Sequence, residues 1–181
     1  FNSSLNFDGT DDYVNIGDPS SGILDVTGTF TISAWIKFPD STNNQTIYSK
    51  TEGTTYGSYW LVKRRSGLDN KLTFQSFPST GNVLGNAVPV NTWQHVAITY
   101  NSAGNVVIYQ DGVQTNSAAA PDTVTANSIN VNIGQRASND QRAAGQIDDV
   151  RIYNYALTGT QVKNLYNGGA AVKFAPLTGS P

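Results

Sequence analysis

The carboxylate side chains are the first candidates for catalytic residues, but their spacing argues against glycoside hydrolysis by a pair of carboxyl groups. Glu52 is the only glutamate, and the other twelve of the 13 acidic residues are aspartates. Glycoside hydrolysis ordinarily needs two carboxyl groups roughly 5 to 9.5 Å apart, which a strand supplies from alternate positions. No acidic residue is followed by another two positions later, and the adjacent pairs Asp11-Asp12 and Asp148-Asp149 would point to opposite faces of a regular strand. Catalysis by paired carboxylates is therefore disfavoured.

Nucleophilic catalysis is also disfavoured, because the side chains that it needs are scarce. His95 is the only histidine, and the sequence has no cysteine, so it lacks thiol nucleophiles and multi-histidine metal sites. A serine nucleophile would depend on this one imidazole as its base near neutral pH. His95 precedes the strand-like residues Val96, Ile98 and Tyr100, and we interpret it as a structural or surface residue. We expect a protein that is not an enzyme.

Asp148 is the strongest candidate for a metal ligand. It alternates with Val150 and Ile152, which predicts that its carboxylate faces the same side as two apolar residues. An ionised carboxylate facing a core needs a partner. Calcium is a natural one, because it binds carboxylate, carbonyl and water oxygens. The alternative partners are Arg151 and a backbone amide.

Aromatic side chains outside the core pattern are candidates for binding a ligand, since rings pack on the apolar faces of sugars while polar side chains orient the hydroxyls. In the segment 72–77, Leu72 and Phe74 are predicted to face the core, which leaves Gln75 and Phe77 outward. Either Tyr59 or Trp60 must also face outward. A polar loop follows between the late strands. The predicted ligand-binding residues are Tyr56, Tyr59, Phe77, Arg136, Asn139, Asp140 and Arg142.

The elements that must position these residues are mostly strands. Segments of alternating apolar residues recur at short intervals, which is typical of an all-β sandwich. In residues 30–38 every second side chain is apolar, so that face is predicted to be core. The Asp111-Gly112 dipeptide suits a type I′ hairpin turn. The predicted strands are 3–7, 13–16, 30–38, 46–49, 59–63, 71–77, 93–100, 106–110, 129–133 and 145–153.

One short helix is predicted at 159–167. Thr158 and Gln161 form a capping-box pattern, and Val162, Leu165 and Tyr166 share one helical face. We expect a single domain over residues 1–169, because 181 residues suit one domain. The Pro/Gly/Ser-containing residues 170–181 are expected to be a tail or the start of a linker in a longer polypeptide.

Composition excludes several classes of partner. The 11 Lys and Arg residues are scattered apart from residues 63–65, whereas nucleic-acid binding needs a clustered basic face. No apolar run approaches the ~18 residues of a membrane span. We therefore expect neither nucleic-acid binding nor membrane insertion.

Three segments in this order resemble the laminin-G-like branch of the concanavalin A-like lectin/glucanase superfamily. They are residues 5–14 (LNFDGTDDYV), residues 92–100 (TWQHVAITY) with 107–112 (VIYQDG), and residues 145–154 (GQIDDVRIYN). The resemblance implies a jelly-roll sandwich of two curved antiparallel sheets, commonly secreted or displayed at the cell surface and often holding calcium. It also implies Asp8, with Asp11 or Asp12, as calcium ligands together with Asp148. The alternative is that these three aspartates only accept backbone hydrogen bonds in a turn.

The sequence thus predicts a noncatalytic extracellular recognition module that binds carbohydrate and is stabilised by calcium. A protein-interaction or spacer domain of a larger surface adhesin is the alternative, and a glycoside hydrolase is a weaker one. We expect a monomeric module whose partner is a glycan or a cell-surface protein.

Overall fold

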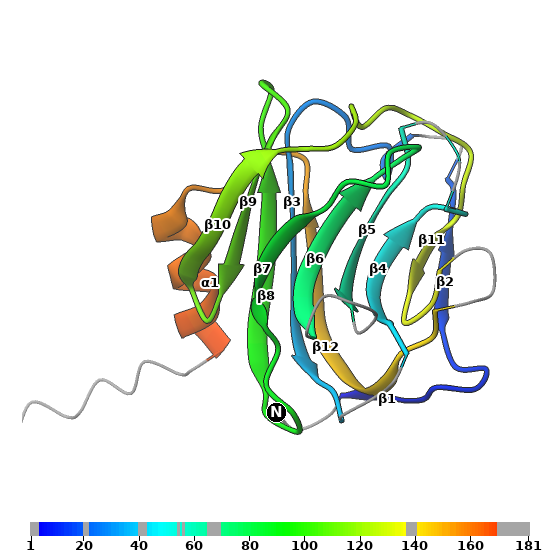
Figure 1. Ribbon diagram of the computed structural model, residues 1–181, viewed down its shortest axis with the longest axis vertical. Helices are drawn as coiled ribbons and strands as arrows, with labels where there is room; N and C mark the ends of the chain where they lie inside the picture. The colour runs from blue at the N-terminus through cyan, green and yellow to red at the C-terminus, as the bar shows by residue number, and fades with distance from the viewer. Residues whose placement is uncertain are drawn as a thin grey trace, which may run out of the picture.

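The computed structural model describes residues 4–19, 22–39, 43–53, 55, 57–64, 70–136 and 141–169, and it forms two antiparallel sheets packed face to face (Figure 1). Sheet A has the strand order β1 (Leu5–Asp8), β12 (Ala144–Tyr153), β3 (Phe30–Lys37), β8 (Gln94–Tyr100), β9 (Asn105–Gln110) and β10 (Val113–Ala119). Sheet B has the order β2 (Val14–Gly17), β11 (Val131–Ile133), β4 (Gln45–Lys50), β5 (Tyr59–Arg64), β6 (Lys71–Ser76) and β7 (Val83–Ala87). The predicted jelly-roll sandwich is confirmed.

The core lies between the sheets and follows the period of two. In β3, Phe30, Ile32, Ala34 and Ile36 are completely buried, as the alternation predicts. Sheet B contributes a row of paired core residues, Ile133, Tyr48, Leu61, Phe74 and Val83, across five neighbouring strands. Burying each such side chain stabilises the fold by roughly 1.5 to 3 kcal/mol relative to leaving it exposed.

A helix, α1 (Gly159–Gly169), packs outside sheet A (Figure 1). Its predicted capping box is present: the Thr158 backbone N–H donates to Gln161 Oε1 (2.9 Å), and the Gln161 N–H donates to Thr158 Oγ1 (3.3 Å). Val162 of the helix packs with Leu157, Ala97 and Tyr109. The helix therefore covers part of the outer face of sheet A and leaves sheet B uncovered by any helix among the described residues. Among the described residues, no helix is long and apolar enough to cross a membrane.

A bulge in β12 changes the direction in which Asp148 points. Asp148 pairs with Trp35, but the register shifts before Arg151, and Asp149 adopts a left-handed φ of 50°. Trp35 lies on the outer face of sheet A, where its ring contacts Tyr166 of α1. Val150 still packs against the core. The expectation that Asp148 faces the core with Val150 and Ile152 is therefore wrong, because the extra residue breaks the alternation.

Candidate ligand-binding groove on sheet B

A row of polar and aromatic side chains crosses the outer face of sheet B. The strand register pairs Asn15 with Asn132, Asn132 with Ser49, Ser49 with Trp60, and Trp60 with Gln75. These residues alternate with the core row, so their side chains point away from sheet A. Strands lie about 4.8 Å apart, so the row is roughly 19 Å long.

Trp60 is fixed in the middle of this row. Its indole Nε1 donates to Gln75 Oε1 (3.1 Å), and Gln75 Nε2 donates to the Ser79 carbonyl (3.0 Å). The Phe77 ring packs against the indole with a centroid separation of 6.2 Å. Trp60, Phe77 and Val62 form a small apolar cluster on the outer face, separate from the main core. An aromatic floor bordered by amide groups is the result.

Arg136 lies over this floor. Its guanidinium carbon is 5.2 Å from the centre of the Trp60 ring, within the range of a cation–π contact. Gly53 lies against the same guanidinium: a Cβ built there would be 2.8 Å from Nη1, and its φ of 97° suits glycine. The turn after β4 and the segment after β11 thus meet above Trp60.

Two hollows flank Arg136. The first, here called the tryptophan hollow, has a volume of about 260 Å³ and is lined by Asn44, Trp60, Gln75, Phe77, Thr80, Asn82, Arg136 and Gln141. The second, here called the asparagine hollow, has a volume of about 220 Å³ and is lined by Tyr13, Asn15, Glu52, Ser128, Ile129, Asn130, Asn132 and Gln135. Both linings consist mainly of aromatic and hydrogen-bonding side chains, which suits a polar organic ligand with apolar faces.

A buried charge holds one wall of the asparagine hollow. Lys50 of β4 is completely buried, and its Nζ donates to the Ile129 carbonyl (2.9 Å). The same ammonium forms ion pairs with Asp18 (2.7 Å) and Asp25 (3.2 Å). Lys50 therefore ties the segment that contains Ile129 to sheet B.

The structure places the predicted ligand-binding residues in different surroundings. Arg136 and Phe77 line the tryptophan hollow, although the Phe77 ring is buried against Trp60 rather than exposed. Arg142 donates from Nε to Gln135 Oε1 (3.0 Å) and lines a neighbouring hollow with Gly9. Tyr56, Asn139 and Asp140 lie outside the described residues.

Tyr59 requires a correction, because it is a core residue with 1% exposure. Leu61 faces the core, and the strand period places Tyr59 on the same side. Its hydroxyl lies 3.4 Å from that of Tyr48, and burial raises the pKa of the Tyr59 hydroxyl well above its ordinary value. Trp60 takes the outward position instead, which the sequence left as the alternative.

Asp8, Asp11 and Asp12 do come together. Their carboxylate oxygens lie within 4.8 Å of one another in the exposed turn after β1. Asp8 Oδ1 accepts the Thr10 N–H (2.6 Å), and Asp12 Oδ2 accepts the Asp8 N–H (2.9 Å). The turn hydrogen bonds anticipated as the alternative are therefore present, beside a set of oxygens that calcium could bind.

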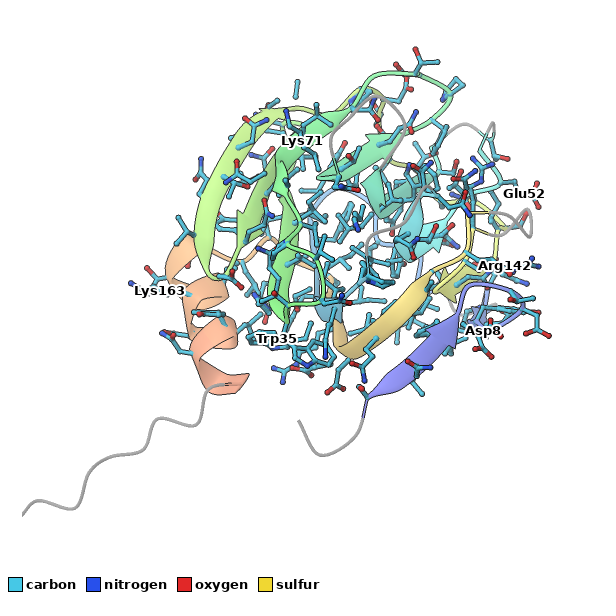
Figure 2. The ribbon with its side chains drawn as sticks, turned by 60° about the horizontal axis from the view of Figure 1, so that its bottom comes forward. Asp8, Trp35, Glu52, Lys71, Arg142 and Lys163 are labelled. Atoms are coloured by element: carbon cyan, nitrogen blue, oxygen red, sulfur yellow. The ribbon has the colours of Figure 1, made fainter. Side chains whose placement is uncertain are left out.

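Asp148 is not part of this group. Asp8 pairs with Ala144, so Asp148 lies four residues further along β12, which is roughly 13 Å away. Figure 2 shows Asp8 on the side of Arg142, away from Trp35, the partner of Asp148. Asp148 Oδ1 accepts the Asp149 N–H (2.7 Å), so the backbone-amide alternative is present. The predicted convergence of Asp148 with the Asp8 turn is not observed.

The sequence interpretation missed Asn132, Gln135 and Tyr13, although a signal for Asn132 was available. Val131 and Ile133 are both core residues, and the polar residue between them must face outward. Gln135 lies beyond the end of β11, where alternation makes no prediction. Tyr13 begins the predicted strand 13–16, in which alternation places it on the face opposite that of Val14, which packs against the core.

The comparisons with known proteins agree with the observed fold. The family model described as the concanavalin A-like lectin/glucanases superfamily, of the laminin G type, matches residues 8–163. The chain belongs to this family. The superfamily description names both lectins and glucanases, and membership supports a recognition module as the coarse function.

Solved structures and a curated relative extend the comparison. Domain 4 of AbnA, an extracellular arabinanase from Geobacillus stearothermophilus solved with arabinotriose, is 26% identical with a TM-score of 0.62, covering 77% of this chain and 67% of that one. The CBM40 domain of the Ruminococcus gnavus IT-sialidase, bound to α2,3-sialyllactose, is 12% identical with a TM-score of 0.73, covering 91% and 96%. Adhesion G-protein coupled receptor V1 of Danio rerio is 23% identical over 85% of this chain, which spans 3% of that protein.

Proposed function

We propose that this domain is a noncatalytic recognition module of a secreted or cell-surface protein and that it binds carbohydrate in the tryptophan hollow. The observation on which the proposal rests is the Trp60 indole, bordered by Gln75, Asn82 and Arg136 on the outer face of sheet B. An indole face packs on the C–H face of a sugar ring. Amide and guanidinium groups around it donate to and accept from the hydroxyls.

The similar structures support this proposal. The AbnA domain, at 26% identity, was solved in complex with arabinotriose, and the CBM40 domain was solved with α2,3-sialyllactose. In both structures a carbohydrate is bound to a protein with this fold. Because a fold alone does not specify a ligand, any ligand of this chain must be recognised by the residues of its own groove.

Arg136 has two functions in this proposal. Its guanidinium covers the Trp60 ring, whose exposure is only 2%, and so keeps the indole from water. In the proposed complex the same guanidinium donates to sugar hydroxyls at the edge of the indole. The contact with Gly53 limits where the guanidinium can lie before binding.

A glycan array followed by calorimetry tests this function. The domain should bind at least one glycan family with millimolar or tighter affinity, and Arg136→Ala should weaken that binding at least tenfold. Arg151→Ala is the matched control, since Arg151 lies in β12 of sheet A and pairs with Asp149 (2.7 Å). Absence of binding to every glycan, or equal losses in the two variants, would contradict the proposal.

We also propose that calcium stabilises the domain at the turn formed by Asp8, Asp11 and Asp12. Three carboxylates within 4.8 Å of one another supply the hard oxygen ligands that calcium prefers, so the donor set fits the ion. Bound calcium would offset the mutual repulsion of the three charges. Its chemical contribution would be structural, by fixing the turn that joins the two sheets.

Melting curves with EDTA and with millimolar calcium test this site. At calcium a hundredfold above its dissociation constant the gain is about 2.7 kcal/mol. For a domain of this size that shifts Tm by roughly 5 to 10 °C. The shift should vanish in Asp12→Asn and persist in Asp148→Asn, the matched control. Wild-type curves that superimpose with and without calcium would contradict the proposal.

A protein-binding module is the second candidate function, favoured by the likeness to an adhesion receptor. It uses the same fold without requiring a sugar. A domain that binds no glycan on the array but pulls down a defined surface protein, with loss in Arg136→Ala, would favour it over carbohydrate recognition.

A further inference from the structure

We infer that the groove takes a neutral oligosaccharide of several units, held by two subsites at once: the tryptophan hollow and the asparagine hollow. The inference rests on the proposed carbohydrate binding and specifies its ligand. It is suggested by the neighbouring positions of the two hollows on sheet B and by an unsatisfied buried group in the second one.

The two hollows belong to one surface. Asn132 and Trp60 lie in the same cross-strand row with only Ser49 of β4 between them, so their backbones are about 10 Å apart. The consecutive residues Gln135 and Arg136 line one hollow each. A ligand that spans Arg136 can therefore touch both hollows. The separation of about 10 Å between the Asn132 and Trp60 backbones exceeds the width of one sugar ring, so such a ligand has more than one sugar unit.

The unsatisfied amide oxygen of Asn132 favours a hydrogen-bond donor in the second hollow. The Asn132 side chain is 97% buried and lines the hollow, yet its Oδ1 has no hydrogen-bond partner in the described part of the protein. Leaving a buried acceptor unsatisfied costs about 1 to 3 kcal/mol. A ligand hydroxyl that donates to Oδ1 would remove this cost.

The charges of the asparagine hollow select an uncharged ligand. Glu52 is the only charged residue among the described residues that line it, and its carboxylate accepts hydrogen bonds but repels anions. Sugar hydroxyls satisfy both Glu52 and Asn132, whereas a sialic or uronic acid would bring a second negative charge. Figure 2 shows Glu52 at the surface of the molecule.

Tyr13 supplies the aromatic surface of this second subsite. Its side chain is 46% exposed and lines the hollow, while Trp60 is the aromatic floor of the first. A ring beside a polar hollow is the arrangement that a sugar needs for both packing and hydrogen bonding. The two subsites thus repeat the same chemistry on either side of Arg136.

The test is a chain-length series on the intact domain. Arabinan, xylan, β-glucan, mannan and galactan fragments, each from the monosaccharide to the hexasaccharide, are titrated by calorimetry into wild type, Tyr13→Ala and Glu52→Gln. Tyr155→Ala is the matched control, because Tyr155 is 48% exposed and lines a different hollow with Ile23 and Leu24. Circular dichroism verifies that each variant is folded.

For the family that binds, affinity should rise at least tenfold between the shortest and the longest fragments. Tyr13→Ala and Glu52→Gln should remove that rise without changing the affinity for the short fragments, and Tyr155→Ala should change neither. Equal affinity at all fragment lengths, or a rise in affinity that persists in both variants, would overturn the inference. In that case, binding that is weakened by Arg136→Ala would still support the proposed function. No binding to any fragment in the series would overturn the inference. If no glycan on the array binds either, the proposed function also fails.

Discussion

Lys50 shows how one residue supports the end of the groove. Its ammonium is surrounded by Asp18, Asp25 and the Ile129 carbonyl, with almost no contact with solvent. Removing one member of a buried ionic group leaves the others uncompensated, which costs more than the group contributes as a whole. Asp18 and Asp25 would then face each other without a cation.

Replacing Lys50 should therefore destabilise the protein. Lys50→Met keeps most of the side-chain volume but removes the charge, and we expect a loss of about 3 kcal/mol in the free energy of unfolding. Urea denaturation followed by tryptophan fluorescence measures this loss. Lys163→Met is the control, since Lys163 is exposed on α1 and should change the free energy by less than about 0.5 kcal/mol. Equal effects of the two substitutions would contradict this account of Lys50.

Tyr59 and Trp60 show why single residues of the site were hard to predict. Both faces of the segment Tyr59-Trp60-Leu61-Val62 are apolar, so alternation cannot say which aromatic ring faces outward. The choice is made by register: Leu61 pairs with Phe74, which the sequence did place in the core. Pairing information, which the sequence of one strand lacks, was the missing step.

The packing of α1 on sheet A is the main feature at the scale of elements, and His95 lies within it. His95 is 3% exposed and packs against both Trp35 and Tyr166, with ring centroids 5.4 Å and 6.1 Å away. Its Nδ1 has no hydrogen-bond partner within the described residues. Burial lowers the pKa of His95 to about 4, although the nearby Asp111 and Asp149 carboxylates oppose this shift and Arg151 adds to it.

This pKa predicts how stability depends on pH. Between pH 6.5 and about 4 the unfolded chain binds a proton at His95 that the folded protein does not, so the free energy of unfolding falls as the pH falls. The loss attributable to His95 should be at most about 3 kcal/mol. Denaturation at pH 7 and at pH 4.5 should show a smaller pH-dependent loss in His95→Gln than in wild type. Parallel losses in the two proteins would contradict the prediction, because carboxylates elsewhere titrate equally in both.

Two strands were not predicted, and the reasons differ. The β7 segment Val83–Ala87 contains Gly85 and only a short apolar pattern, so propensity gives little signal. The β10 segment Val113–Ala119 is an edge strand with largely exposed polar residues. The turn before it was nevertheless recognised: Asp111 and Gly112 have φ of 51° and 73°, as a type I′ hairpin requires. A turn dipeptide can thus indicate a neighbouring strand that the residue composition of the strand does not reveal.

At the scale of the whole molecule, the period of two and the capping box were sufficient to predict the sandwich and the helix α1. The site was predicted only in part, because it forms where Gly53, Trp60 and Arg136 meet from three separate segments. The bulge at Asp149 likewise depends on how β12 meets β3. Local patterns specify which residues are buried, whereas convergence of distant loops depends on topology.

The molecule has a tryptophan ring on the outer face of each sheet, which allows a direct test of carbohydrate binding on sheet B. Trp60 lies in the groove, with its Nε1 donating to Gln75, whereas Trp35 lies under α1 on the opposite sheet. A ligand in the tryptophan hollow must perturb the first indole and leave the second unchanged.

The most direct measurement is a titration of the ¹⁵N-labelled domain with the glycan selected on the array, followed through the tryptophan indole N–H signals. Single-tryptophan substitutions assign the three signals. Binding in the tryptophan hollow predicts a saturable shift of the Trp60 signal, with the same affinity as calorimetry gives, and no shift of the Trp35 signal. A glycan that binds but leaves the Trp60 signal in place, or shifts that of Trp35 instead, would contradict the assignment of the binding groove to sheet B.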